Sequence, residues 1–379
     1  MRRAKGSGAI RKRGDSWQIR YLAPPDSDGK RKNISETVKG LRKEAERVLR
    51  LRTGAIESGS YVEKTSETAE QFFNEWLKTY AAHNTSPRTQ QDYAGHIKRY
   101  VTPEIGQIPL QSLRPQHIQS MENSIFEKGL SGTTALHVHR IVKQSLEHAV
   151  QWEKLVRNPA ASIKAPRPTK RRVSMWDLKT ISRFKAVSMT STYNQIFETA
   201  LITGMRRSEL LGLKWSAIDL ETGKLKVLNT LQRITGKGLV EGIPKTDKSR
   251  RSIKLGQDIV KIFRKIQTAQ VEARLAAGSL WQQTDFVFTK PDGAPIDPDS
   301  VTHEFTRIIR ENELPKLNFH GLRHAHATLL LTSGIHPKVV SERLGHSNIG
   351  ITLDTYSHVL PSLQEEAADA IERQLAKAI

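Results

Sequence analysis

The sequence has 379 residues, with 60 Lys and Arg, 39 Asp and Glu, and a formal net charge of +21. This length predicts two or three domains, and the excess positive charge favours an anionic partner. The chain has no Cys, which excludes disulfides and thiolate metal sites, and no apolar run approaches the ~20 residues of a membrane-spanning helix.

The first 60 residues predict a small folded module. They carry 16 Lys and Arg against 7 Asp and Glu, a net charge of +9. Turn-forming sequences at 13–15 and 24–29 separate three β-like segments, and an amphipathic helix is predicted over 41–56. The segments are residues 8–12, 17–22 and 32–37. The alternatives are a basic disordered tail or a coat on an anionic membrane surface. The alternation of strands and turns, and the absence of an amphipathic helix at the start, favour the folded module.

Residues 66–165 are predicted to be almost entirely helical. Ser86 is a natural N-cap with Pro87 at the first helical position, and a break is expected from Pro103 to Pro109. We interpret the stripe of Phe72, Phe73, Trp76 and Leu77 as core, not as a surface for base stacking. His137, His139 and His148 lack the partner spacing of a metal site, so we place them on a helix face or facing an anionic partner.

The rest of the chain starts with a basic, Pro-rich stretch at 158–172, which reads as an extended linker. A mixed region begins near Val173, with Ser174 as the expected cap of the next helix. A helix over 193–203 is expected to stop at Gly204. Strands are predicted over 225–228, 230–234, 251–255 and 285–289, a loop around Lys245, a helix over 301–310 and an amphipathic tail helix over 362–379.

Residues 320–359 organise the chain and read as helix, turn, helix, turn, helix. Gly334 and Gly345 are expected to end two of the helices, and Pro337 to open the second. His320 and Arg323 are three residues apart, so they share a helix face. An Arg and two His near Tyr356 suit chemistry on a phosphate, because guanidinium groups neutralise phosphate oxygens, imidazoles exchange protons and a tyrosine can act as a nucleophile.

The motifs HGLRHAHAT, LGHSNIGITLDTY and TGMRRSELLGLKW resemble those of the tyrosine recombinase (phage and conjugative-transposon integrase) family. The resemblance runs from about residue 66 to the end, and the first 60 residues are similar to one branch of the family. It implies a multidomain α+β fold. The expected domains are an arm-type DNA-binding domain at 1–60 with a small β-sheet and a helix, an all-α core-binding domain at 66–165, and a mainly helical catalytic domain with a small antiparallel sheet at 173–379.

The resemblance implies a site-specific recombinase that integrates and excises a mobile element through a 3′-phosphotyrosyl intermediate. Arg206 and Arg323 would neutralise the phosphate, Lys245 would protonate the leaving oxygen, and Tyr356 would attack; His320 and His346 complete the implied set. Of the adjacent arginines we assign Arg206 to catalysis, because it follows TGM, and leave the role of Arg207 ambiguous. Glu209, one turn after Arg206, is interpreted as orienting that helix start. His324 and His326 resemble a metal cluster, but no carboxylate accompanies them in their helix.

The same resemblance implies no cofactor, no metal and no membrane partner. The expected partners are double-stranded DNA at core and arm-type sites, three further copies in a homotetramer and an accessory directionality protein, in the cytoplasm of a bacterial cell. The alternatives are a chromosome-dimer-resolving recombinase, a related topoisomerase, and a non-catalytic architectural protein on the same fold. The basic N-terminal module favours the integrase, and the intact set of six residues argues against loss of catalysis.

Overall fold

The computed structural model describes residues 8–25, 28–169, 175–244, 247–356, 368, 371–373 and 375–376. The chain divides into two compact units, Met1–Lys170 and Arg171–Ile379. Helices predominate and the sheets are small and antiparallel, which confirms the predicted α+β fold class. Across these described ranges, no helix is both long and apolar enough to cross a membrane.

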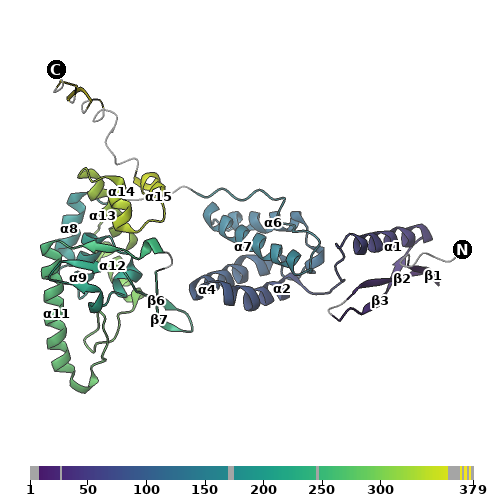
Figure 1. Ribbon diagram of the computed structural model, residues 1–379, viewed down its shortest axis with the longest axis horizontal. Helices are drawn as coiled ribbons and strands as arrows, with labels where there is room; N and C mark the ends of the chain where they lie inside the picture. The colour runs from purple at the N-terminus through teal and green to yellow at the C-terminus, as the bar shows by residue number, and fades with distance from the viewer. Residues whose placement is uncertain are drawn as a thin grey trace. The chain divides into compact units, whose positions relative to one another are not determined.

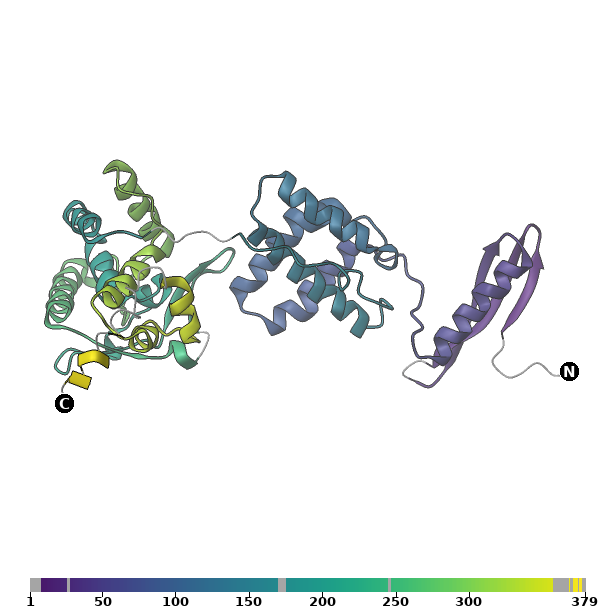
Figure 2. The same cartoon turned by 90° about the horizontal axis from the view of Figure 1, so that it is seen from above.

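The first unit begins with a three-stranded antiparallel sheet covered on one face by a helix (Figures 1 and 2). Alternation along the strands turns Ile19 and Tyr21 toward the helix, where they are buried against Ala45 and Leu49. The three predicted strands and the predicted helix are confirmed. Their bounds are β1 (Ala9–Arg13), β2 (Ser16–Pro25), β3 (Arg31–Lys39) and α1 (Arg42–Glu57).

The remainder of this unit is a helical bundle. Ser86 caps α4 by accepting a hydrogen bond from the Thr89 backbone N–H at 3.3 Å, with Pro87 next, as predicted. The predicted break is present, but it begins at Gly106 and not at Pro103, because Pro103 lies in the first turn of α5, where its missing N–H costs no helical bond. The helices are α2 (Ala69–Trp76), α3 (Ala82–Asn84), α4 (Pro87–His96), α5 (Thr102–Ile105), α6 (Pro115–Glu127) and α7 (Gly132–Gln151), with π-helical turns at Leu77–Ala81 and Ile97–Val101.

Aromatic side chains form the centre of the bundle. Phe72, Phe73 and Trp76 are fully buried, which confirms that this stripe is core. His139 is also buried, 2.7 Å from the Glu122 carboxylate, so it faces the inside of the bundle and not an anionic partner. His148 is half-buried and accepts a hydrogen bond from Trp76 Nε1 at 2.7 Å. Because these two rings have partners inside the bundle, they contribute to its packing.

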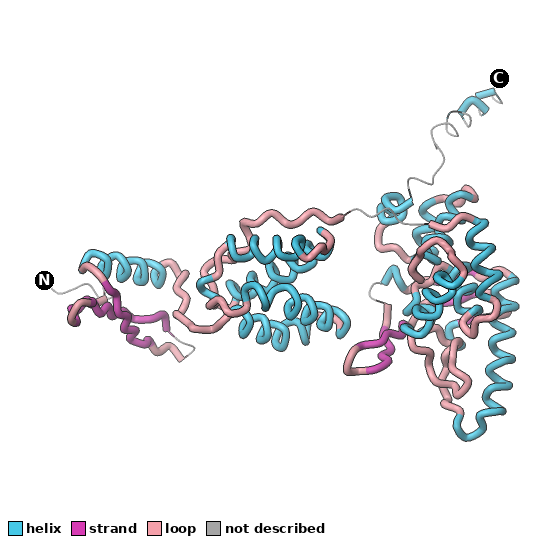
Figure 3. The backbone as a smooth tube through the Cα atoms, turned by 180° about the vertical axis from the view of Figure 1, so that it is seen from behind, coloured by secondary structure: helices cyan, strands magenta, loops and turns pink. Residues whose placement is uncertain are grey.

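The second unit is mainly helical, and one of its two small sheets is a hairpin that projects from its edge (Figure 3). Strands β4 (Ile218–Asp219), β5 (Lys224–Lys226) and β8 (Ser252–Lys254) form one sheet, and β6 (Thr230–Ile234) and β7 (Gly238–Gly242) form a hairpin. The helices are α8 (Leu178–Ser188), α9 (Asn194–Thr203), α10 (Arg207–Leu211), α11 (Gln257–Ala277), α12 (Pro298–Glu311), α13 (His320–Thr332), α14 (Pro337–Leu344) and α15 (Ile349–Tyr356).

Several local predictions for this unit need correction. Asp177 caps α8, accepting from the Thr180 N–H at 2.7 Å, whereas Ser174 lies outside the described residues. The predicted strand at 285–289 forms only isolated bridges, Phe286 with Lys214 and Thr289 with Pro295. Helix α11 and strand β7 were not predicted from the sequence. The predicted tail helix at 362–379 lies outside the described residues except for 368, 371–373 and 375–376, which are helical.

Candidate active site

Arg206 stands at the start of α10 and is held there by the residue one turn later. Its backbone N–H donates to Glu209 Oε2 at 3.0 Å, and its guanidinium Nη1 donates to Glu209 Oε1 at 2.6 Å. The carboxylate thereby satisfies a backbone donor that has no partner within the helix, as in a capping box. This supports the interpretation that Glu209 orients the helix start.

Glu209 also binds a second arginine, which the sequence analysis missed. Arg251 donates from Nη1 and Nη2 to the two carboxylate oxygens, at 3.2 and 2.9 Å. Burial alone would raise the pKa of Glu209, but the charges and hydrogen bonds of Arg251 and Arg206 outweigh it and hold the pKa below its ordinary value. The ionised carboxylate therefore fixes two cations at the edge of the site.

Arg323 is buried and is oriented by the ends of two helices. Its Nη1 donates to the Gly204 carbonyl at 2.8 Å and its Nη2 to the Leu344 carbonyl at 2.7 Å. Helices α9 and α14 end at Gly204 and Gly345, both left-handed with φ of 65° and 70°. A Cβ on Gly204 would lie 2.5 Å from the His326 ring, so this turn requires glycine. Burial lowers the pKa of Arg323 to about 9, which leaves it charged at neutral pH.

His320 opens α13, and His346 follows the glycine that ends α14. The His346 Nδ1 is hydrogen-bonded to Thr352 Oγ1 at 2.8 Å. Burial, together with neighbouring cationic side chains, lowers the pKa of each imidazole to about 4. Both rings are therefore neutral at pH 7, so each can donate a hydrogen bond from one nitrogen and accept one at the other.

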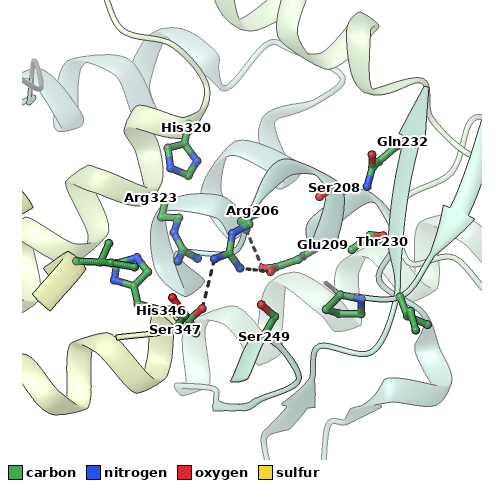
Figure 4. Close-up of a pocket in the computed structure, with 14 residues that line it drawn as sticks. Arg206, Ser208, Glu209, Thr230, Gln232, Ser249, His320, Arg323, His346 and Ser347 are labelled. Atoms are coloured by element: carbon green, nitrogen blue, oxygen red, sulfur yellow. Dashed lines mark hydrogen bonds and ion pairs between the residues drawn. The ribbon is translucent and has the colours of Figure 1, made fainter. Parts of the chain in front are cut away.

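These side chains meet in one pocket of about 440 Å³ (Figure 4). Four of the six predicted site residues line it, namely Arg206, His320, Arg323 and His346. Ser208, Glu209, Thr230 and Gln232 lie on the other side of the Arg206 guanidinium. Two guanidinium groups beside two neutral imidazoles form a site that suits a phosphate group. The fifth predicted residue, Lys245, lies outside the described residues, immediately after Pro244 of the pocket lining.

Tyr356, the sixth predicted residue, does not line this pocket. Its side chain is 1% exposed and packs with Leu331, Val340 and Leu344 of α13 and α14. Its hydroxyl lies 2.6 Å from His324 Nδ1. Burial raises the pKa of Tyr356 to about 12, so the hydroxyl is protonated at neutral pH.

The two histidines that resembled a metal cluster have separate partners. His324 binds the Tyr356 hydroxyl, whereas His326 Nδ1 is hydrogen-bonded to the Leu201 carbonyl at 2.8 Å. Within the described ranges, no group of three or more His, Asp or Glu side chains could hold a metal ion. Arg207 points to α12, where its Nη1 donates to the Pro298 carbonyl at 2.9 Å, so it belongs to the packing of the unit.

Replacing Glu209 with Gln should destabilise the second unit strongly. The substitution removes the charge that compensates Arg251, whose side chain is 6% exposed, and breaking a buried pair costs about 3–5 kcal/mol. Because the pKa of Glu209 is lowered on folding, its contribution is present above the unfolded pKa and is lost as the pH falls through the folded pKa. Urea unfolding measures the change. Glu221→Gln is the control, since that carboxylate is exposed, and it should change stability by less than ~0.5 kcal/mol; equal effects would contradict the prediction.

Comparison with known proteins agrees with this geometry. Residues 176–362 match the phage integrase family, and residues 68–126 match the phage integrase N-terminal SAM-like domain. The chain belongs to the phage integrase family and is a tyrosine-type site-specific recombinase. This confirms the resemblance that the three sequence motifs carried.

Relatives match most of the recombinase. It is 28% identical to a XerC-like tyrosine recombinase of Caldanaerobacter subterraneus, over 97% of this chain and 98% of that protein. It is 25% identical to the ICEBs1 integrase of Bacillus subtilis, over 76% of this chain and 78% of the relative. Its fold is similar to that of the Tn1549 transposon integrase in complex with a circular intermediate DNA, with a TM-score of 0.68, 22% identity, and coverage of 82% of this chain and 100% of the other.

Proposed function

We propose that this recombinase cuts and rejoins double-stranded DNA at the attachment sites of a mobile element, which it integrates and excises. The observation that carries the proposal is the convergence of Arg206, Arg323, His320 and His346 on one pocket. Strand cleavage builds negative charge on the non-bridging phosphate oxygens in the transition state. Two fixed guanidinium groups stabilise that charge, and they need no rearrangement because carboxylate and carbonyl groups already orient them.

Tyr356 is the nucleophile in this proposal. Its hydroxyl must leave His324 before it can reach a phosphate in the pocket. A tyrosine with a raised pKa needs a base. His320 is neutral, so one of its nitrogens can accept the proton, and the negative charge of a bound phosphate would raise the imidazole pKa from its low value in the free protein. The product is a 3′-phosphotyrosyl bond, which resembles the phosphodiester it replaces. The energy of the broken bond is thereby kept, so rejoining needs no nucleotide cofactor.

Lys245 supplies the remaining proton in this proposal. The leaving 5′-oxygen is strongly basic and must be protonated as the bond breaks. The ammonium group of a lysine, on a long and flexible side chain, suits a general acid. His346 adds a hydrogen-bond donor to the phosphate. Because the guanidinium groups supply the positive charge, the proposed reaction requires neither a metal nor a cofactor.

The proposed domains are an arm-binding domain at 1–60, a core-binding domain at 66–165 and a catalytic domain at 173–379. Support for the first comes from the sheet face opposite α1. Strand pairing places Arg11 beside Gln18 and Thr37, and Arg13 beside Ser16 and Lys39. Arg20 occupies the same face, and the paired residues of this face include no Asp or Glu. A basic β-sheet surface of this kind suits the major groove of DNA.

Recombination requires partners beyond a single DNA site. We propose that four copies assemble on core DNA in the cytoplasm, with the tail at 362–379 docking on a neighbouring copy and an accessory protein setting direction. Support comes from a fold neighbour, a lambda integrase tetramer bound to a Holliday junction, with a TM-score of 0.59, 17% identity, and coverage of 95% of this chain and 96% of that one. Ile371 and Leu375 of the tail are exposed and therefore available for such docking.

A suicide substrate tests the proposed function. In a nicked core-site duplex, cleavage releases a short fragment and so traps the protein on the DNA. The recombinase should form an adduct that survives denaturing electrophoresis. A non-catalytic architectural protein would bind the same duplex and leave no adduct.

Neutralising the open face of the N-terminal sheet should separate cleavage from integration. In the variant Arg11→Gln, Arg13→Gln, Arg20→Gln, binding to the distant arm repeat should weaken. The slope of the logarithm of the affinity against the logarithm of the salt concentration should become shallower by about one for each lost phosphate contact. Cleavage of a core-site suicide substrate should be unchanged. Filter binding at several salt concentrations measures the first effect, and gel assays measure the second.

The matched control removes the same charge from α1. Lys43, Arg47 and Arg50 are exposed on that helix, and replacing them with Gln should leave arm binding nearly intact. Equal loss of arm binding in the two variants would show that net charge, not the sheet face, binds the arm. Full integration activity by the sheet variant would contradict the assignment of an arm-binding domain.

A further inference from the structure

The hydroxyl of Thr230 is an unused polar group in the wall of the pocket. Thr230 is the first residue of β6, lines the pocket and is 6% exposed. Among the residues described, no partner within hydrogen-bond distance of its Oγ1 is found. Leaving a buried hydroxyl unpaired costs free energy. Because Thr230 lines the pocket and its hydroxyl has no partner among the described residues, this residue points to a ligand there.

Two glycines fix the position of this hydroxyl. Gly242 pairs with Thr230 across the β6–β7 hairpin, and a Cβ on it would lie 3.2 Å from Oγ1. On the other side, a Cβ on Gly212 would lie 2.6 Å from the Thr230 Cα. Backbone packed this closely leaves Thr230 little room to move, so its hydroxyl is already placed before a ligand arrives.

The surroundings of Thr230 indicate what that ligand is. Figure 4 shows Thr230, Ser208 and Gln232 on one side of Glu209, and Arg206 and Arg323 on the other. The first group is neutral and rich in hydrogen-bond donors, the kind of side chain that positions DNA through phosphate oxygens. The Glu209 carboxylate between the two groups keeps a phosphate on the arginines separate from the hydroxyl of Thr230.

We propose that Thr230 is a positioning residue that donates a hydrogen bond to the phosphate next to the scissile one on the DNA strand in the pocket. This inference rests on the proposed function and deepens it. The inference predicts that the Thr230 hydroxyl has no hydrogen-bond partner in the free protein and gains one only when DNA is bound. Removing the hydroxyl should raise the stability of the free protein, and it should lower both the affinity for DNA and the rate of DNA cleavage.

Thr230→Val tests this prediction, since valine keeps the shape of the side chain and lacks the hydroxyl. Affinity for the core duplex and single-turnover cleavage at subsaturating protein should each fall about ten- to a hundredfold, the range for one hydrogen bond to a charged group. The melting temperature of the free protein should stay equal or rise. Thr230→Ser should bind and cleave like the parent protein. The control, Thr199→Val in α9, removes a hydroxyl that donates to the Gln195 carbonyl at 2.7 Å. It should leave both DNA measurements unchanged and not raise the melting temperature.

A methylphosphonate placed at one phosphate at a time locates the contact. At the phosphate next to the scissile one, Thr230→Val should cause no further loss on the diastereomer in which methyl replaces the contacted oxygen, because that acceptor is gone. Unchanged DNA binding by Thr230→Val, a lowered melting temperature, or an undiminished defect on every methylphosphonate duplex would each overturn the inference. If the parent protein bound core DNA without forming an adduct, the proposed function would fail, and the affinity measurements would still decide the role of Thr230.

Discussion

Tyr356→Phe should abolish the covalent adduct while leaving affinity for core DNA nearly unchanged. Phenylalanine keeps the ring that packs with Leu331, Val340 and Leu344, and the substitution removes only the oxygen that would attack the phosphate. His324 loses its hydrogen-bond partner, which should cost little, since a neutral bond contributes about 0.5–1.5 kcal/mol. A suicide substrate measures adduct formation, and fluorescence anisotropy measures DNA binding.

Tyr193→Phe is the matched control for this experiment. Tyr193 is half-buried against the main core of the same unit, so the change has the same chemistry at a residue that does not line the pocket. It should form the adduct at the parent rate. Detection of an adduct with the Tyr356 variant would show that another residue attacks the phosphate.

Arg206→Ala and Arg323→Ala should each slow cleavage by about 10²–10³, the loss typical of removing one fixed donor from a charged transition state. The two variants should differ in stability. The Arg323 guanidinium is buried and joins the ends of α9 and α14 through two carbonyls, so its loss should also lower the melting temperature. The Arg206 side chain is 35% exposed, and Glu209 keeps its pair with Arg251, so this variant should lose less stability and should report mainly the catalytic effect. Single-turnover rates at saturating protein measure it.

Arg207→Ala provides the control, because this neighbouring guanidinium donates to the Pro298 carbonyl and not into the pocket. The Arg207→Ala substitution should lower the melting temperature and leave the cleavage rate nearly unchanged. A normal rate for Arg206→Ala together with a severe defect for Arg207→Ala would reverse the assignment of the two arginines.

Local sequence patterns predicted several helix ends, including both ends of α14 beside the site. Gly345 and Pro337 bound α14, as their backbone preferences indicate, and Ser86 with Pro87 begins α4. These local patterns gave wrong or missing predictions where tertiary packing determines the secondary structure. Phe286 lies in an apolar run typical of a strand, but it forms only an isolated bridge with Lys214. Helix α11 was missed over its whole length, although Ile259, Val260, Phe263 and Ile266 are buried at helical spacing.

The pocket residues could be predicted because their motifs resemble those of a family. The contacts that fix the positions of their side chains could not be predicted. Arg251 and Glu209 lie 42 positions apart, and nothing in the basic run around Arg251 distinguishes the arginine that becomes buried. The contact between His324 and Tyr356 joins residues 32 positions apart in α13 and α15. Such pairs depend on how helices pack, so sequence spacing could suggest a metal cluster where the structure has a tyrosine partner.

Mapping the adduct tests the central claim most directly. The full-length protein is trapped on a suicide substrate in the presence of EDTA, digested with nuclease and protease, and analysed by mass spectrometry. We expect a nucleotide joined to the peptide that contains Tyr356, at the yield obtained without EDTA, because Arg206 and Arg323 supply the charge stabilisation. A nucleotide on a different residue, or an adduct that EDTA removes and a divalent ion restores, would contradict the proposed mechanism.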